Sequence, residues 1–382
     1  MSEVDQLRLA RTEGVGPVTY RRLMRRFGSA AAALEALPRL ARAGGRTTTP
    51  VVPGVERAER EVDRIARLRG RILFVDGPDY PPLLGLLEDA PPVVMVLGRV
   101  AALHGRAVAL VGSRNASANG QRIAEQLAQQ LAHDGLVVVS GLARGIDAAA
   151  HEGALREGTT VACVAGGVDV PYPPEHANLQ ARIAASGGAV IGEASPGTAP
   201  MARHFPRRNR VIAGLSLGIV VVEAAVRSGS LITARLGQEM HREVFAVPGS
   251  PLDPRCRGSN DLIRNGAHLV EHAADVIENL PDHPSREGLG RNTLFRHGPP
   301  PAALAEVREP WEKAEPPAAE AERVRAALLQ LLGPSPTSVD DLARRCQFSP
   351  ASVNSALMDL ELAGRVEALP GNRFALIGEA GP

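Results

Sequence analysis

A doubly wound α/β core with a mostly parallel sheet is the fold class that this 382-residue sequence predicts. Six short Val/Ile-rich runs lack polar alternation, which is typical of strands buried on both faces of a parallel sheet. Between the first two runs, Ile123, Leu127 and Leu131 have the spacing of a helix face that covers the sheet. Repeated strand–helix units with short connections favour the doubly wound arrangement. The runs are residues 108–111, 137–139, 161–164, 190–191, 219–222 and 244–247.

Four parts follow one another along the chain: a helical domain (1–70), the α/β core (71–280), a linker (281–320) and a C-terminal domain (321–378). In the first part, segment 13–17 (Glu-Gly-Val-Gly-Pro) lies between two Arg-rich amphipathic stretches. This pattern indicates a helix-hairpin-helix, whose backbone N–H groups can hold a DNA phosphate. A helical packing module without a DNA role is the alternative. The linker contains eight prolines and little apolar periodicity.

The C-terminal domain is predicted to be a winged helix, because three helical segments precede a hairpin with its turn at 370–372 (Pro-Gly-Asn). The third helix of such a domain usually reads the duplex groove. Here that helix carries Asp359 and Glu361 and neither lysine nor arginine. We therefore expect it to contact protein, or to contact DNA only weakly.

The composition excludes several classes of protein. Lys+Arg (43) and Asp+Glu (42) are almost balanced, and Lys313 in the linker is the only lysine, so a Walker-type nucleotide site or a Schiff-base enzyme would lack its amine. Three separated cysteines and ten histidines without ligand spacing predict no disulfide framework, no metal and no cofactor. No run approaches the ~20 apolar residues of a membrane span, and the N-terminus lacks a signal-peptide pattern. These features predict a cytoplasmic protein with no membrane partner.

A basic octet stands out against this neutral background. Residues 203–210 read Arg-His-Phe-Pro-Arg-Arg-Asn-Arg, within a stretch, 194–222, that has no Asp or Glu. Guanidinium groups bind phosphate oxygens in a bidentate fork, and the ring of Phe205 can stack on an unpaired base. A solvated basic loop is the alternative interpretation of the octet taken alone.

Three consecutive predicted strands are each followed by a glycine turn, and two of these turns contain an arginine. Because the carboxyl ends of parallel strands meet at one edge of a sheet, we expect the turns and the octet to converge there and to admit phosphate. No G-x-G-x-x-G dinucleotide fingerprint is present at the first turn, and Asp147 is expected to cap the helix after the second. The turns are segments 112–114 (Gly-Ser-Arg), 141–144 (Gly-Leu-Ala-Arg) and 166–167 (Gly-Gly).

Two features of the sequence are similar to enzyme sites, a G-x-S-x-G match and a glutamate at a strand end. Segment 214–218 fits G-x-S-x-G, but a helix-like stretch precedes it and a strand follows, which reverses the order of a nucleophile elbow. Glu223, at a strand end before Ser228-Gly229-Ser230, is the best acid/base candidate. Capping of the next helix explains the two serines equally well.

Several segments of the core are distinctive in combination: GSR at 112–114, SGLARGID at 140–147, Ala150-His151, Phe205-Pro206 with RNR at 208–210, SGSLITA at 228–234 and FAVPG at 245–249. Together they resemble the bacterial DNA processing protein A (DprA/Smf) family over residues 71–280. The resemblance implies an extended Rossmann-like core. The two ends resemble accessory domains of that family, a helical domain of helix-hairpin-helix or SAM-like type and a winged helix.

The same resemblance implies a function. Family members bind and protect incoming single-stranded DNA in natural transformation, load the RecA recombinase, displace or accommodate single-strand-binding protein, form homodimers and have no established catalytic activity. Their DNA pocket uses an arginine that matches Arg114 and an aromatic residue that matches Phe205. Many members place a lysine shortly before that aromatic, where this chain has Arg203 as the nearest cation. The candidate DNA-binding residues are Gly112, Ser113, Arg114, Gly141, Arg144, Gly166, Gly167, Arg203, Phe205, Arg207, Arg208, Asn209, Arg210, Ser228, Gly229 and Ser230.

Two other functions stay open at this point. Rossmann-like phosphoribohydrolases also combine glycine turns, an arginine and a glutamate, roles in which Arg207 or Arg210 and Glu223 could be cast. A transcription regulator with a ligand-sensing α/β domain would use the winged helix as its DNA reader, and the acidic third helix counts against this.

Overall fold

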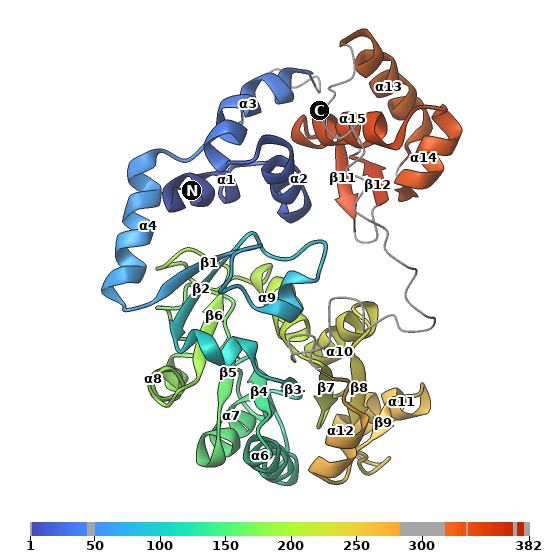
Figure 1. Ribbon diagram of the computed structural model, residues 1–382. Coiled ribbons are helices and arrows are strands. Elements are labelled where there is room, and N and C mark those ends of the chain that lie inside the picture. The colour runs from blue at the N-terminus through green and yellow to red at the C-terminus, as the bar shows by residue number, and fades with distance from the viewer. Residues whose placement is uncertain (1, 44–49, 283–317, 334, 370–372, 378–382) are drawn as a thin grey trace, which may run out of the picture. The chain divides into compact units, whose positions relative to one another are not determined.

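The computed structural model describes residues 2–43, 50–282, 318–333, 335–369 and 373–377 (Figure 1). The chain divides into two compact units. The core unit consists of residues 61–87 and 93–295, and the second unit of residues 1–60, 88–92 and 296–382. Within the described ranges, no helix has the length and apolarity needed to cross a membrane.

The core unit contains a nine-stranded sheet in the order β1-β2-β6-β5-β4-β3-β7-β8-β9 (Figure 1). The strands from β6 to β9 in this order are parallel, and β1 and β2 pair in antiparallel fashion at one edge. The predicted mostly parallel sheet is therefore confirmed, and the six predicted runs correspond to β3 to β8. The strands are β1 Arg71–Phe74, β2 Val93–Gly98, β3 Ala107–Val111, β4 Val137–Ser140, β5 Thr160–Cys163, β6 Ala189–Gly192, β7 Gly218–Val221, β8 Glu243–Ala246 and β9 His268–Leu269.

Helices cover both faces of this sheet. On one face, α6 and α7 pack with α12 against side chains such as Val108 and Val220. On the other face, Gly237 of α10 lies against Ile219, whose side chain points away from that of its neighbour Val220. Helix α9 contacts β3, β4 and β5. The helices are α5 Pro82–Gly85, α6 Ala118–His133, α7 Ile146–Glu157, α8 Ala177–Ala185, α9 His204–Leu215, α10 Gly229–Glu239, α11 Arg257–Arg264 and α12 Ala273–Asn279, with 3₁₀ turns η1 Val100–His104, η2 Pro174–His176 and η3 Pro254–Cys256.

The strand order reverses between β3 and β7. Strands β4, β5 and β6 follow on one side of β3, whereas β7 and β8 lie on the other side. In open α/β sheets, ligands bind beyond the carboxyl ends of the strands, and the crevice at such a reversal is the usual place. We therefore expect a ligand-binding site at the β3/β7 crevice or at the neighbouring strand ends.

The second unit contains the N-terminal helices and the winged helix. Helices α1 Glu3–Ala10, α2 Pro17–Phe27 and α3 Ala30–Ala43 pack together, and α4 Val55–Arg67 runs on into the core unit. Gly16 precedes α2, and Pro17 occupies its first turn, where the missing N–H costs no hydrogen bond. The winged helix has the predicted three helices and hairpin, with the turn 370–372 outside the described residues. Its elements are α13 Ala318–Leu331, β10 Thr337–Ser338, α14 Val339–Cys346, α15 Pro350–Leu362, β11 Val366–Leu369 and β12 Arg373–Leu376.

His151 of α7 is a structural residue of the core. It is fully buried, and its Nδ1 lies 2.7 Å from the Thr160 hydroxyl, which itself donates to the carbonyl of Val138. The Nε2 atom is also buried and has no hydrogen-bond partner among the described residues. Burial, followed by the charges of His176 and Arg208, lowers the pKa of His151 from 6.5 to about 3.

This lowered pKa predicts acid sensitivity. The unfolded chain takes up a proton at His151 near its ordinary pKa, whereas the folded protein does not until about pH 3, so the free energy of unfolding should fall as the pH drops through this window. Replacement His151→Gln removes the titration and should flatten this part of the profile. Urea unfolding at about pH 7, 5.5 and 4.5 measures the difference, and His133→Gln, at an exposed histidine, is the control. Parallel profiles for wild type and His151→Gln would contradict the assignment.

Candidate functional site

A pocket of about 130 Å³ lies at the carboxyl ends of β3, β4 and β5, where the first residues of α9 approach them. We call it the strand-end pocket. It lies beside the β3/β7 crevice rather than in it. Its lining combines apolar side chains with three arginines, which suits a ligand that has both flat apolar and anionic parts. The lining residues are Arg114, Gly141, Ala143, Arg144, Val164, Ala165, Gly166, Val170, Tyr172, Pro173, Pro174, Phe205 and Arg208.

The aromatic ring of Phe205 is the centre of the strand-end pocket. The guanidinium carbon of Arg114 lies 5.1 Å from the ring centroid, within the range of a cation–π contact. Tyr172 meets the same ring edge to face, with 5.9 Å between centroids and 62° between planes. The guanidinium carbon of Arg208 also lies over this ring, 5.6 Å from the centroid, and Phe205 as a whole is half-buried. Arg114 and Phe205, which the family resemblance assigns to one DNA pocket, are therefore in direct contact.

Arg208 lines the strand-end pocket with a buried side chain that is fixed by hydrogen bonds, and we call it the pocket floor. Its guanidinium is buried and donates to the carbonyl of Gly141 and, at 3.5 Å, to that of Cys163. Burial lowers the pKa of Arg208 and raises that of the nearby Asp147, while their mutual attraction opposes both shifts. A Cβ on Gly141 would overlap this guanidinium. The glycine of the second turn therefore makes room for a buried arginine.

Asp147 does not cap helix α7, contrary to the sequence-based expectation. Gly145 is the N-cap residue and has a positive φ of 73°, and Asp147 is buried in the first turn. Its carboxylate accepts a bond from the Ala143 backbone N–H at 3.3 Å. Asp147 thus stabilises the 141–144 turn and balances the charge of Arg208.

Besides Arg114, a second exposed cation lines the strand-end pocket, and two more lie close to Phe205 in the chain. Arg144 is exposed and forms an ion pair with Glu175, and this hydrogen bond lowers the pKa of the Glu175 carboxyl. Arg203 and Arg207 are exposed at the start of α9. The guanidinium of Arg144 thus already has one anionic partner, the Glu175 carboxylate.

The remaining candidates lie outside the lining of the strand-end pocket. Arg210 is half-buried beside Glu193, at 3.7 Å. Asn209 is buried and bonds to the side chain of Arg208. Ser228, Gly229 and Ser230 form the N-terminus of α10, with Ser228 as the cap. Positions Gly112, Ser113 and Gly167 also do not line the pocket, and the space beside Gly112 and Gly167 is filled by neighbouring protein atoms.

Sequence reasoning missed Tyr172 and the Pro173-Pro174 segment that follows it. They belong to the long connection between β5 and α8, whose path over the sheet edge has no periodic signal. The one available sign was an aromatic residue between prolines in the sequence Val-Pro-Tyr-Pro-Pro at 170–174. Prolines fix the backbone and hold such a ring in place.

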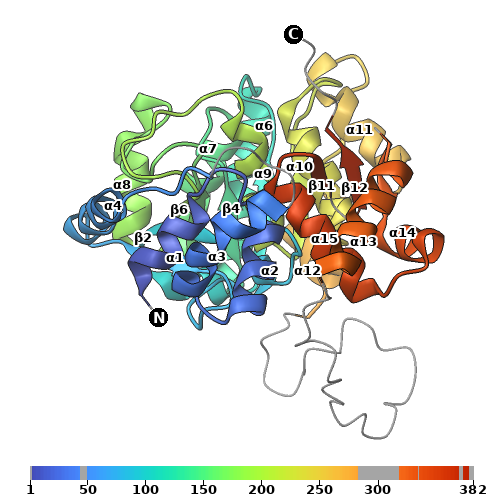
Figure 2. The same cartoon turned by 90° about the horizontal axis from the view of Figure 1, so that it is seen from above.

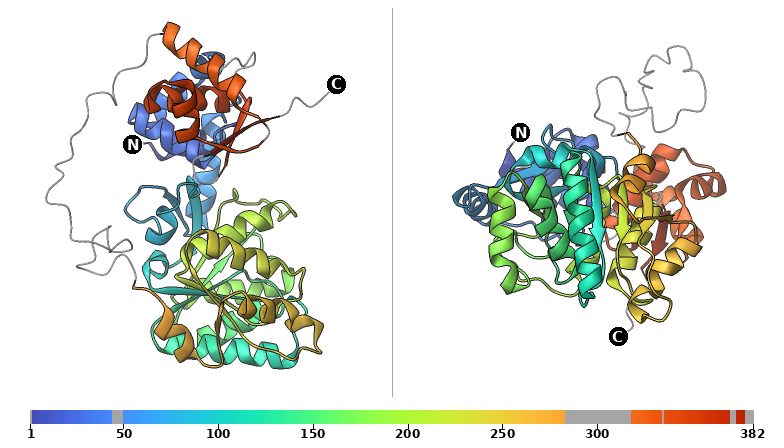
Figure 3. Two further views of the ribbon diagram at one scale, coloured as in Figure 1. Left: turned by 90° about the vertical axis from the view of Figure 1, so that its right-hand side faces the viewer. Right: turned by 90° about the horizontal axis from the view of Figure 1, so that it is seen from below.

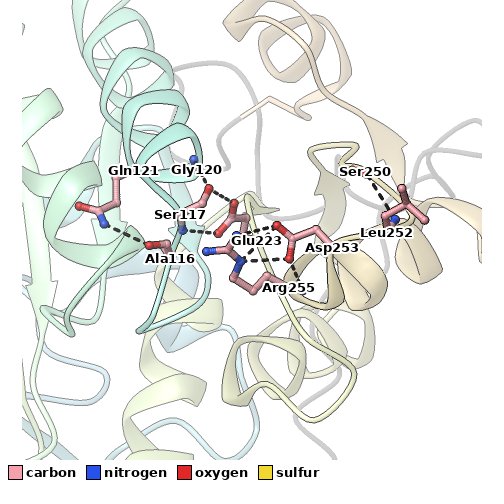
Figure 4. A network of polar contacts seen from close by, with 9 residues as sticks. All are labelled: Ala116, Ser117, Gly120, Gln121, Glu223, Ser250, Leu252, Asp253 and Arg255. Atoms are coloured by element: carbon pink, nitrogen blue, oxygen red, sulfur yellow. Dashed lines mark hydrogen bonds and ion pairs between the residues drawn. The ribbon is translucent and has the colours of Figure 1, made fainter.

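The β3/β7 crevice is occupied by the chain's own carboxylate (Figure 4). Glu223, just after β7, is buried, and it accepts hydrogen bonds from both the hydroxyl and the backbone N–H of Ser117, the latter at 2.9 Å. Ser117 is the N-cap of α6, so Glu223 sits at the positive end of that helix, where other α/β proteins bind phosphate. Asp253 and Arg255 form an ion pair beside it. The Glu223 carboxylate is thus engaged in a structural contact.

No group of metal-binding side chains occurs in the described part of the chain. Cys163 and Cys256 are buried free thiols, and burial raises the pKa of Cys163 to about 12, which keeps it protonated and unreactive.

Comparison with known proteins identifies the relatives of this chain. Residues 71–281 match the family described as DNA recombination-mediator protein A, residues 1–63 a DprA-like N-terminal HHH domain, and residues 312–372 a DprA winged helix domain. Protein Smf of Escherichia coli K12 is 39% identical over 313 residues, which cover 80% of this chain and 77% of that protein.

Two solved structures are similar as well. DNA processing protein A of Streptococcus pneumoniae has 35% identity and a TM-score of 0.61, covering 74% of this chain and 98% of that one. The Helicobacter pylori protein, whose structure concerns a single-stranded DNA binding mode, has 27% identity and a TM-score of 0.50, covering 55% of this chain and 94% of that one. Family models match all three domains, and the chain is 39% identical to Protein Smf of Escherichia coli over 80% of its length. The chain therefore belongs to the DNA processing protein A (DprA/Smf) family.

Proposed function

We propose that this protein binds single-stranded DNA in the strand-end pocket, protects incoming strands during DNA uptake and loads the RecA recombinase on them, without catalysing a reaction. The contact of Arg114 with the half-buried ring of Phe205 carries the proposal. An accessible aromatic face stacks any base, and an adjacent guanidinium binds the backbone phosphate. The single-stranded DNA binding described for the Helicobacter pylori relative supports the same ligand.

The arrangement of charge favours a flexible strand. Arg114 and Arg144 line the pocket and are exposed, Arg203 and Arg207 are exposed two residues to either side of Phe205 in the chain, and the guanidinium of Arg208 is buried. The pocket has a volume of only about 130 Å³, so a base has to leave its stack to enter it. Single strands offer unstacked bases at much lower cost than a duplex does.

The phosphoribohydrolase alternative requires Glu223 as an acid or base. That carboxylate is buried and held by Ser117, and the strand-end pocket is not lined by it. The regulator alternative requires a third helix that reads duplex DNA. That helix is α15, which carries no lysine or arginine for the groove, and its Asp359 is buried in an ion pair with Arg325, at 3.2 Å. The contacts of Glu223 and Asp359 count against these two alternatives.

We expect the protein to prefer single-stranded over duplex DNA, with little dependence on base sequence. If these four exposed arginines each neutralise one phosphate, the logarithm of affinity should fall with the logarithm of salt concentration with a slope of about −3, from roughly −0.7 per contact. Fluorescence anisotropy with a labelled oligo(dT), a mixed-sequence oligonucleotide and a matched duplex at graded NaCl measures all three quantities. Tighter duplex binding, or a slope near zero, would sink the proposal.

The proposed loading of RecA and the proposed homodimer are tested separately. RecA strand exchange on DNA coated with single-strand-binding protein should start sooner when this protein is present. Cross-linking with purified RecA and sedimentation of the protein alone test the proposed RecA contact and the homodimer. Wild-type DNA binding without any effect on RecA would leave a DNA-binding protein that is not a loader.

A further inference from the structure

Helix α15 of the winged helix is buried on more than the face that builds its own domain. Val353, Leu357 and Leu360 belong to the winged-helix core. Met358 and Leu362 are also buried, with 3% and 1% exposure, although helical geometry places them on the opposite side of α15. A helix that is apolar on both sides has a second partner.

That second partner is the N-terminal helical domain, which lies in the same compact unit. Helix α15 contacts α2 and α3, and Figures 2 and 3 show the blue N-terminal helices beside α15. The guanidinium of Arg26 on α2 donates to the hydroxyl of Ser355 at 3.4 Å. Ser355, Met358 and Leu362 follow one another at intervals of three and four residues, so they form one stripe along α15.

Charge accompanies this apolar contact. Arg22 of α2 lies over the ring of Phe374 on strand β12, with 5.1 Å to its centroid. Glu361, at the C-terminal end of α15, is close to Thr19 and Arg22. Burial raises the pKa of Glu361, and the neighbouring Thr19 and Arg22 oppose that shift. Residues 19, 22 and 26 share one face of α2, so an arginine-bearing face of α2 meets an acidic and apolar face of α15.

We propose that α15, the helix with which winged-helix proteins commonly read duplex DNA, is in this protein a docking surface for the N-terminal helical domain of the same chain, which contacts it through α2 and α3. The surface consists of Ser355, Met358, Glu361 and Leu362, with Phe374 at its edge. Docked α2 covers the side of α15 that a DNA groove would receive. The winged helix is therefore held against the N-terminal helical domain, and it does not bind duplex DNA through α15 while the two are docked. This inference is independent of the proposed function of the strand-end pocket.

Cross-linking of the full-length protein tests the docking. Cysteines are introduced as Arg26→Cys and Ser355→Cys in a Cys346→Ser background, because Cys163 and Cys256 are buried. A short bismaleimide should join them within one chain, giving a product of monomer mass. Adding Glu361→Arg should slow the reaction about tenfold, since it places two cations at one partly desolvated contact. Adding Arg22→Glu to that variant should restore the rate.

Controls separate docking from misfolding. Glu367→Arg changes an exposed glutamate of β11 by the same charge and should leave the rate as in the parent. If Glu361→Arg melts the winged helix, Arg22→Glu alone gives the same repulsion from the other side and should slow the reaction. No cross-link, a product of dimer mass only, or equal rates for Glu361→Arg and Glu367→Arg would overturn the proposal.

Discussion

Replacement Arg208→Met should destabilise the core by about 3–5 kcal/mol, the cost of removing one partner from a buried set of charges. The loss leaves the Gly141 carbonyl without this donor and Asp147 without its nearby cation. Chemical unfolding followed by circular dichroism measures the change. Arg207→Ala, at the exposed neighbouring position, should stay within about 0.5 kcal/mol of the wild type.

A double variant makes the cause specific. Asp147→Asn combined with Arg208→Met removes the carboxylate that the single change leaves uncompensated, so it should be more stable than Arg208→Met alone. If instead Arg208→Met folds as well as the wild type but no longer binds DNA, Arg208 acts on the ligand directly, and its role as pocket floor is wrong.

Phe205→Ala and Arg114→Ala should have the largest effects on DNA binding, and by different routes. Loss of the ring should weaken binding by ~1–3 kcal/mol per stacked base and leave the salt slope unchanged. Loss of the guanidinium should cost a similar ~1.5–3 kcal/mol and reduce the slope by about 0.7. Anisotropy titrations at several salt concentrations separate the two signatures. Arg235→Ala is the control, since this exposed arginine of α10 does not line the pocket.

The melting temperature of Phe205→Ala distinguishes a DNA-stacking role of Phe205 from a packing role. The ring is half-buried against Tyr172 and Arg114, so its loss should lower the melting temperature by only a few degrees. A larger drop in melting temperature, with binding per folded molecule intact, would mean that Phe205 is a packing residue. The stacking platform would then have to be Tyr172.

The α/β core was predictable because burial on both faces of a parallel sheet leaves an unbroken apolar run in the sequence. The same logic located the helix that includes Ile123 and Leu127. At the strand-end pocket, Arg114 could be singled out because it follows a predicted strand end, and Phe205 because it lies within the basic octet. Both signals are local in sequence.

What could not be predicted depends on distant partners. An arginine within a basic octet reads as a surface residue, and only the fold shows that Arg208 reaches the Gly141 carbonyl, 67 positions away. Asp147 reads as a helix cap until that arginine is placed beside it. The acidic third helix of the winged helix led us to expect a protein contact or a weak DNA contact. The contact between Arg26 of α2 and Ser355 of α15 could not be predicted, because more than 300 residues separate the two in the chain.

The position of Glu223 has a consequence for the way this protein meets free nucleotides in a cell. Its carboxylate is attached to the same chain as the N-terminus of α6, so its effective concentration at that helix end exceeds that of a dissolved phosphate compound. We therefore expect cofactors and nucleoside triphosphates to compete poorly with the tethered carboxylate for this helix end. Occupancy of the crevice between β3 and β7 would then not follow the energy and redox state of the cell. A ligand at the neighbouring strand ends would meet the same surface whether nucleotides are scarce or abundant.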